Sequence, residues 1–289
     1  MNKFAMLFGF MYGDGWIDIH KHGGFSGDKE SLQIAKNDLI ELFGDIGKAK
    51  IRTQKMISPK YKIIGTTSQF AVNSNVSKAF IEAGMPIGKK VEQEWLIPNW
   101  IMNGSQDVQQ SFLSGLYAAE GFTPITKCED RSFKPLGLLL TKRLILRNNF
   151  EQMMNQLGNI ISNVGINYSV ARRLTHTCSD NIEIRFNFKN SLQNIYNTTQ
   201  LLDIRYCVKK HRSFSFVSSY LFEVLNYGSS IININNPIYK LTEQQIQYLS
   251  EQSGISINRI NQYLNGEFSK QSSRRIPYTE FVSNLLFIK

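Results

Sequence analysis

The chain is poor in cysteine and has no long apolar run. Its three cysteines, Cys128, Cys178 and Cys207, are odd in number and widely spaced, and none belongs to a CxxC pair. This pattern argues against a disulfide framework or a zinc site and is typical of thiols in a reducing compartment. No apolar segment reaches the length of a membrane span, and the first residues lack the basic region and cleavage site of a signal peptide. We therefore expect an intracellular protein without membrane contact, in an organellar matrix, a bacterial cytoplasm or a phage-infected cell.

Acidic residues are also scarce relative to basic ones. The sequence has 33 Lys and Arg residues against 23 Asp and Glu residues, which gives a formal net charge of +10. No extended basic tail carries this excess, so it indicates a folded surface that meets polyanions. Nucleic acid fits better than an anionic membrane because apolar membrane segments are missing.

A short apolar pattern occurs twice in the sequence. The segments AMLFGFMYGDG (residues 5–15) and SFLSGLYAAEG (residues 111–121) are 106 positions apart. In each copy small residues recur every four positions and therefore form one stripe along a helix, where two backbones can approach closely. The stripes predict a helix interface at Gly9, Gly13, Gly115 and Ala119. The alternative, one buried helix in each domain, leaves the matching acids that end the two copies unexplained.

These acids are Asp14 and Glu120, and they predict a metal site. A carboxylate at a helix C-terminus is electrostatically unfavourable, so a positive group should lie close by. If the two helices pack together, both carboxylates emerge at one end, beside the outward-pointing carbonyls of Gly13 and Ala119. Such oxygen ligands suit hard cations such as Mg²⁺. In a basic protein, this site points to phosphodiester chemistry.

The two segments resemble the paired motifs of a monomeric LAGLIDADG homing endonuclease. The resemblance covers about residues 1–225 and implies metal-dependent double-strand cleavage of a long DNA target, with two or three Mg²⁺ ions and with Asp14 and Glu120 as catalytic metal ligands. In the family a second acid often lies two residues before the last one. That position is Tyr12 in one copy and Ala118 in the other. Glu120 in place of Asp is a tolerated variation.

The order of the expected elements agrees with a duplication. After each motif helix the sequence predicts two strands, a helix, two more strands and a helix, and in the first copy the second helix is expected at residues 37–47. The expected fold is α+β: two αββαββα halves, residues 1–103 and 104–226, related by a pseudo-two-fold axis and containing saddle-shaped antiparallel sheets.

The remaining residues have a different composition. Residues 227–240 are rich in Asn and Ser and predict a linker. Residues 241–289 contain helix-turn-helix spacing, which predicts a small all-α DNA-binding extension with Asn258, Arg259 and Gln262 on its second helix. The alternative is a helical hairpin packed on the rest of the protein.

The strands of each half are candidates for tracking a DNA groove. Asp18, His20 and His22 would share one face of the first strand, and Thr123 and Lys127 one face in the second copy. The basic candidates for phosphate contacts are Arg52, Lys55, Lys60, Lys62, Arg172 and Arg173. Each could alternatively be an ordinary solvated charge.

The family resemblance also implies a catalytic lysine after the third helix of each half. PIGKKV selects Lys90, with Lys89 adjacent, and RYCVKKHR selects Lys210, with Lys209 adjacent. A lysine there could stabilise the charge of the transition state.

Three functions remain open from the sequence. The first is a monomeric, site-specific endonuclease of double-stranded DNA, as in intron homing. The second is an intron maturase that binds structured RNA, which needs no intact acids. The third is a transcription regulator with a helix-turn-helix. The two intact acids favour the nuclease.

Overall fold

The computed structural model describes residues 1–58, 63–124, 134–174, 180–231, 242–253, 256–258 and 261. The described residues belong to two compact units. The first contains residues 1–122, 137–188 and 201–208, and the second contains the described parts of residues 123–136, 189–200 and 209–289. The fold is mixed α+β, with two antiparallel sheets. In the part of the chain that is described, no helix is both long and apolar enough to cross a bilayer.

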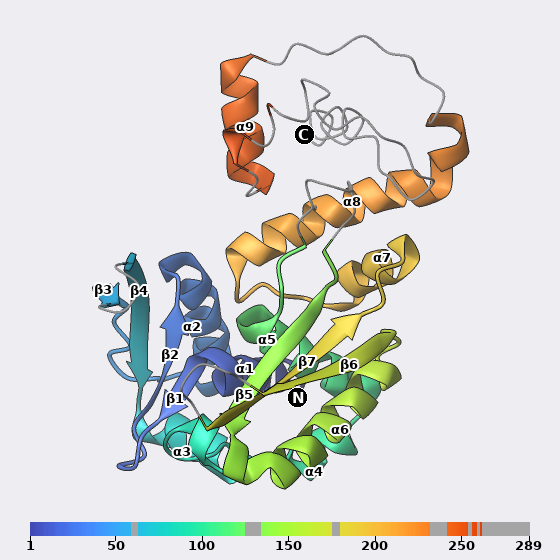
Figure 1. The fold of residues 1–289 in the computed structure, drawn as a ribbon. Coiled ribbons are helices and arrows are strands. Elements are labelled where there is room, and N and C mark those ends of the chain that lie inside the picture. Colours follow the sequence, from blue (N-terminus) through green and yellow to red (C-terminus); the bar gives the residue numbers. More distant parts are fainter. Residues whose placement is uncertain are drawn as a thin grey trace. The chain divides into compact units, whose positions relative to one another are not determined.

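The first half of unit 1 alternates helices with hairpins, as the sequence predicts (Figure 1). Its sheet has the order β1-β2-β4-β3, and every pair of neighbours is antiparallel. The elements are α1 (Asn2–Asp14), β1 (Gly15–Ile17), β2 (Gly23–Gly27), α2 (Lys29–Phe43), β3 (Arg52–Ser58), β4 (Ile63–Val72) and α3 (Ser74–Glu82).

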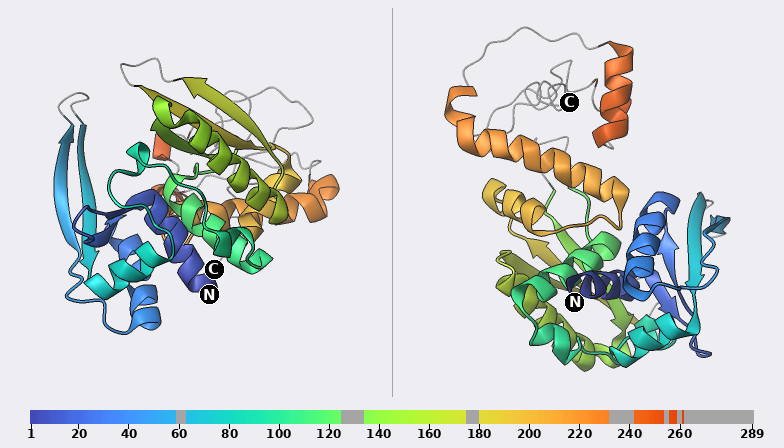
Figure 2. Two further views of the ribbon diagram at one scale, coloured as in Figure 1. Left: turned by 90° about the horizontal axis from the view of Figure 1, so that it is seen from below. Right: turned by 180° about the vertical axis from the view of Figure 1, so that it is seen from behind.

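The second half contains a similar series behind a connecting stretch. Its described strands form a sheet of order β5-β7-β6, and α6 runs along one face of this sheet (Figure 2). The connecting stretch, at the end of the first half, contains η1 (Lys90–Glu92) and α4 (Asn99–Met102). The elements of the second half are α5 (Gln106–Glu120), β5 (Gly137–Arg143), η2 (Leu144–Leu146), α6 (Arg147–Asn163), β6 (Tyr168–Leu174) and β7 (Asn181–Phe188).

Strand register supports the duplication. In the first half, Phe25 of β2 lies opposite Gly15, the residue that follows the motif helix. In the second half, Leu138 of β5 lies opposite Gly121, which follows the other motif helix. Each motif helix therefore leads into the same kind of strand pairing.

Apolar periodicity explains most of the elements. Residues 5–12 of α1 are all buried, so this helix is core on every side. In β7 the side chains alternate, with Ile182, Ile184, Phe186 and Phe188 buried. The equivalent side of β4 buries Ser68, Phe70 and Val72.

Two local predictions in the first half are wrong. Helix α2 begins at Lys29, well before the expected residue 37, because the Asp28 carboxylate caps it by accepting from the Ser31 amide at 3.0 Å. Residues 18–22 form the turn of the first hairpin rather than a strand face. There the Asp18 carboxylate accepts from the amides of His20 and His22, both at 2.9 Å, which favours a turn.

Each half contains, near its end, a connecting segment that is held by the opposite half. In the first connecting segment (residues 90–97), the amide of Trp95 donates to Asn149 Oδ1 of α6 and the amide of Ile97 donates to Gln156 Oε1, both at 2.9 Å. Because both side-chain acceptors come from α6, this segment is fixed to the second half.

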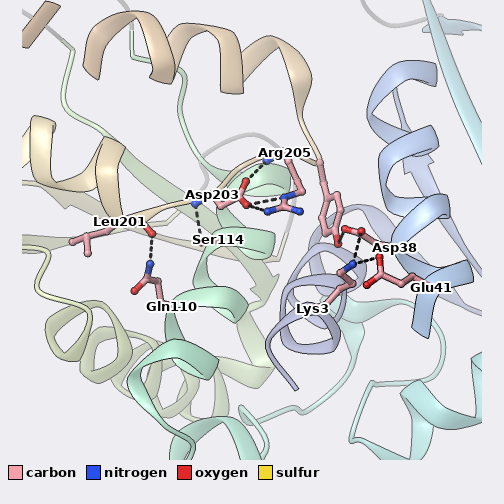
Figure 3. Close-up of polar contacts among 9 residues, drawn as sticks. Lys3, Asp38, Glu41, Gln110, Ser114, Leu201, Asp203 and Arg205 are labelled. Carbon is pink, nitrogen blue, oxygen red and sulfur yellow. Dashed lines mark hydrogen bonds and ion pairs between the residues drawn. The ribbon is translucent and has the colours of Figure 1, made fainter. Parts of the chain in front are cut away.

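The second connecting segment (residues 201–208) is fixed to α2 of the first half. The Val208 amide donates to Ser31 Oγ at 2.9 Å, and the Tyr206 hydroxyl donates to the Asp38 carboxylate at 2.7 Å. Asp38 is only 8% exposed and also pairs with the Lys3 ammonium at 3.1 Å (Figure 3). The two halves of unit 1 therefore hold each other's connecting segments in the same way.

The same segment also contacts α5 (Figure 3). Gln110 Nε2 donates to the carbonyl of Leu201 at 2.7 Å, and the Asp203 amide donates to Ser114 Oγ at 3.1 Å. The segment is thus anchored at both ends.

Unit 2 is helical in its described part. It contains most of α7 (Leu192–Leu201), nearly all of α8 (Val208–Ile231) and α9 (Glu243–Ser253). Tyr196 of α7 and Phe222 of α8 approach within 6.4 Å between ring centroids. Helix α9 falls where the first helix of the predicted helix-turn-helix is expected, and most of the second helix lies outside the described residues.

Candidate functional site

Helices α1 and α5 lie side by side in the centre of unit 1 (Figure 1). A Cβ added at Gly9 would lie 2.1 Å from the Phe112 carbonyl oxygen, and one added at Gly115 would lie 1.8 Å from the Met6 carbonyl oxygen. Neither position has room for a methyl group. The small-residue stripes therefore lie where the two backbones approach most closely.

This close approach extends to the ends of both helices. A Cβ added at Gly13 would lie 2.2 Å from Ala119 Cβ and 3.3 Å from Glu120 Cγ. Since α1 ends at Asp14 and α5 at Glu120, the two acids lie at adjoining C-termini. Asp14 is exposed and Glu120 partly exposed, so both carboxylates can reach a ligand.

Lys90 supplies the positive charge that two C-terminal acids require. Its ammonium donates to the last carbonyl oxygens of α1, at 2.8 Å from Met11, 2.5 Å from Tyr12 and 2.9 Å from Gly13. A cation at this position binds carbonyls of the last helical turn and offsets the negative end of the helix dipole. The lysine therefore makes a carboxylate tolerable at this end of α1.

The protonation of Lys90 follows from its surroundings. Burial lowers the pKa of Lys90 to about 8, while the charges of Glu120 and Asp14 raise it and that of Lys142 lowers it. At neutral pH the side chain keeps its proton, as donation to three carbonyls requires. The ammonium is thus a fixed positive charge beside both acids.

Lys142 of β5 is a second buried lysine that sequence reasoning missed. It is 2% exposed, and its ammonium donates to the carbonyls of Lys90 and, at 2.6 Å, Gln93. Burial lowers the pKa of Lys142 to about 8. The strand alternation that buries Leu138 and Leu140 also points residue 142 inward, and that alternation was the available signal.

Tyr12 stands where the family motif often carries a further acid, and it is buried. Its ring stacks on Trp95 at 3.9 Å between centroids, and its hydroxyl donates to Met153 Sδ at 3.3 Å. Burial, and after it the charge of Glu120, raises the pKa of Tyr12 above the usual value, so the phenol stays neutral. Its role is packing between the halves.

The donor chemistry at the helix ends fits a hard divalent cation. Two carboxylates and outward-facing carbonyls offer oxygen atoms only, and Mg²⁺ is usually bound by one or two carboxylates completed by water or phosphate. No group of three or more His, Cys, Asp or Glu side chains that could hold a metal ion occurs among the described residues. Gly13 also accepts from Lys90, and a carbonyl has a second lone pair for a ligand.

The other predicted site residues are dispersed. Asp18, His20 and His22 form the β1–β2 turn, and Arg52 and Lys55 are exposed on β3. Lys210 lies in the first turn of α8 and Thr123 after α5, both in unit 2, whereas the acids belong to unit 1. Asn258 is exposed. Arg172 and Arg173 lie on β6, with side chains outside the described set, and Lys60, Lys62, Lys127, Arg259 and Gln262 lie outside the described residues.

Arg185 of β7 is a further basic residue that the sequence analysis did not select. It lies on the side of β7 opposite the buried Ile184 and Phe186, with its guanidinium carbon 4.3 Å from the ring centroid of Phe122. Among the described residues, its buried Nε has no hydrogen-bond partner. Strand alternation was again the signal that could have identified it.

Known proteins resemble this chain only over part of their length or at low sequence identity. No family model matches the chain. The tRNA-splicing ligase RtcB of Methanocaldococcus jannaschii is 29% identical over 179 residues, which are 56% of this chain and 18% of that protein. The replication factor C small subunit of the same organism is 30% identical over 132 residues, 43% of this chain and 7% of that protein. The chain thus spans less than a fifth of either relative. A solved structure of mesophilic variants of the homing endonuclease I-DmoI aligns with 70% of this chain and 95% of that chain, at 14% identity and a TM-score of 0.41.

Proposed function

We propose that this protein is a metal-dependent endonuclease that makes a double-strand break in a long, asymmetric DNA target. The observation that carries this proposal is the pair of acids at adjoining helix ends beside a half-buried lysine whose side-chain nitrogen donates to three carbonyls of α1. Oxygen ligands for divalent cations, next to a fixed positive charge, match the requirements of phosphodiester hydrolysis.

The proposed site residues would have separate roles in metal binding and in charge stabilisation. Asp14 and Glu120, with the carbonyls of Gly13 and Ala119, would hold Mg²⁺, which would supply positive charge to the phosphate and acidify the attacking water. Lys90 would fix the end of α1 and direct its charge at the developing negative charge of the phosphate. We propose Lys210 for the corresponding role in the second half.

The proposed DNA surface combines the hairpins with the basic excess of the chain. Arg52 and Lys55 supply exposed charge on β3. Arg185 adds a guanidinium that lies over the ring of Phe122. We propose contacts with phosphates and bases for these residues, for the β1–β2 turn and for residues 241–289 as an additional DNA-binding segment.

The two relatives correspond to this chain over too little of their length to indicate its activity. A tRNA-splicing ligase and a replication factor subunit share only 18% and 7% of their lengths with this chain. Matches that cover so small a part of proteins with unrelated names are best explained by separable modules. We infer that the matched residues are such a module, as the duplicated motif that resembles homing endonucleases also indicates.

Cleavage of a randomised duplex library in Mg²⁺ tests the proposal. The wild type should enrich double-strand cuts at one long motif, and a chelator should abolish them. Asp14→Asn and Glu120→Gln should each leave nicking or no cutting, because each removes a ligand charge. Glu82→Gln is the matched control, since this exposed acid on α3 pairs with Lys78 in an exposed ion pair, and it should cut like the wild type.

Other outcomes would overturn the nuclease. Specific retention of DNA without cutting in any divalent cation would favour a regulator. Absence of DNA selectivity would favour a protein that binds structured RNA. Undiminished cutting by both acid variants would reject the assigned site.

A further inference from the structure

The turn that carries Lys90 is held from the other half of the duplication. Helix η1 is a single 3₁₀ turn, which has little stability of its own. Lys142 of β5 donates to the carbonyl of Lys90 itself and to that of Gln93, at the two ends of this turn. One buried ammonium therefore bridges the turn at both ends.

Further contacts come from the same side. Arg143, the next residue of β5, pairs with Glu92 of the turn at 3.3 Å, in a partly exposed position. The amides of Trp95 and Ile97 donate to side chains of α6. The backbone that positions Lys90 is thus attached to β5 and α6, whereas the Lys90 side chain acts on α1.

We propose that Lys142 is a positioning residue that sets the Lys90 ammonium against the end of α1, so that the second half controls the lysine of the first half. This proposal rests on the proposed function for its effect on cleavage. The contacts form a chain from Lys142 Nζ to the Lys90 carbonyl, and from Lys90 Nζ to the carbonyls of Met11, Tyr12 and Gly13.

A lysine is an unusual choice for this buried position. An apolar side chain would continue the pattern of Leu138 and Leu140 without the cost of burying a charge. An ammonium has three donors, however, and here two of them meet carbonyls that would otherwise lose their partner. The cost is understandable if the turn must be held in one place.

The first test measures position without any cleavage. An amine-acylating reagent is applied to wild-type protein, Lys142→Met and Lys142→Gln, and modification is quantified for each lysine by mass spectrometry. We expect the rate at Lys90 to rise about tenfold in Lys142→Met, because loss of the bridge frees a protected ammonium, and to rise less in Lys142→Gln, which keeps an amide donor. Exposed Lys89 is the internal reference, and Lys78→Met is the control variant.

The second test measures cleavage of each strand separately. Lys142→Met should slow cutting about 10- to 100-fold, with the same strand bias as Lys90→Met and without weaker DNA binding. Adding Lys142→Met to Lys90→Met should cause no further loss. A role in general stability would slow both strands equally and would add to the effect of Lys90→Met.

Each outcome decides the proposal. Unchanged acylation at Lys90 in a folded Lys142→Met variant would overturn it, as would additive loss of cleavage. Failure of both Lys142 variants to fold would assign this lysine a structural role and would also overturn it. If the wild type cuts no DNA, the proposed function fails, and the acylation rates still decide whether Lys142 positions Lys90.

Discussion

At the scale of single residues, the duplicated acids raise the question of how a helix can end on a carboxylate. Lys90 answers it, because its ammonium donates to three carbonyls in the last turn of α1, those of the residues just before Asp14. Sequence reasoning required a positive group there and the family resemblance selected Lys90. It did not find Lys142, because a lone lysine in a strand reads as a solvated charge unless the inward side of that strand is known.

The glycine contacts between α1 and α5 give a prediction for stability. Gly115→Ala would place a methyl group 1.8 Å from the Met6 carbonyl oxygen, so the helices must separate. We expect the free energy of unfolding to fall by about 1–3 kcal/mol or more, the usual effect of overpacking. Urea denaturation followed by circular dichroism measures the change.

Gly65→Ala is the matched control for that substitution. A Cβ at Gly65 would have no heavy atom within 4 Å, and the backbone there has no positive φ. Its effect should stay within about 0.5 kcal/mol. Equal effects of the two substitutions would contradict the close helix contact.

At the scale of elements, the sequence predicts the order of helices and hairpins well and their boundaries less well. The sequence predicts a strand at residues 181–188, which is β7, and a helix that begins at Ser74, as α3 does. It does not identify the cap, which is Asn73, whose side chain accepts from the Val76 amide at 3.0 Å. The early start of α2 was missed because Lys29 and Glu30 show no apolar periodicity. The connecting segments were also missed, since their stability comes from side chains of distant helices.

These distant side chains make the first connecting segment testable. Asn149→Ala removes the acceptor of the Trp95 backbone amide. The Trp95 residue is only 7% exposed, so water has little access to this amide. An unsatisfied donor of this kind costs about 1–3 kcal/mol. Hydrogen exchange should therefore become faster at Trp95 and its neighbours than elsewhere in the chain.

Gln33→Ala is the control for this loss of a side-chain hydrogen bond. Gln33 Nε2 donates to Asn37 Oδ1 at 2.9 Å on the exposed surface of α2, where water can replace the partner. Exchange at Trp95 should be unchanged in this variant. Equal protection of Trp95 in wild type and Asn149→Ala would show that the segment is held by other contacts.

At the scale of the whole molecule, the buried ammonium of Lys142 makes stability depend on pH. Burial lowers the pKa of this group from 10.5 to about 8. Between these values the unfolded chain binds more protons at this group than the folded chain does. Its contribution to the free energy of unfolding therefore rises with pH across this window and is constant below it.

Denaturation at about pH 7.5 and about pH 9.5 isolates this contribution. The difference in unfolding free energy between wild type and Lys142→Met should shift in favour of the wild type at the higher pH. The same comparison for Lys78→Met, a lysine in an exposed ion pair, should show no shift. A difference that falls as pH rises would mean that the folded protein stabilises the charged form.

The contacts of the second connecting segment determine when, during synthesis, the fold can be completed. Ser31 and Asp38 meet Val208 and Tyr206 across 177 and 168 residues of chain. Contacts between such distant positions form slowly, and a chain leaving the ribosome must wait for its later residues before it can make them. The N-terminal half is synthesised first, but its helix α2 can make these contacts only when residue 208 has emerged.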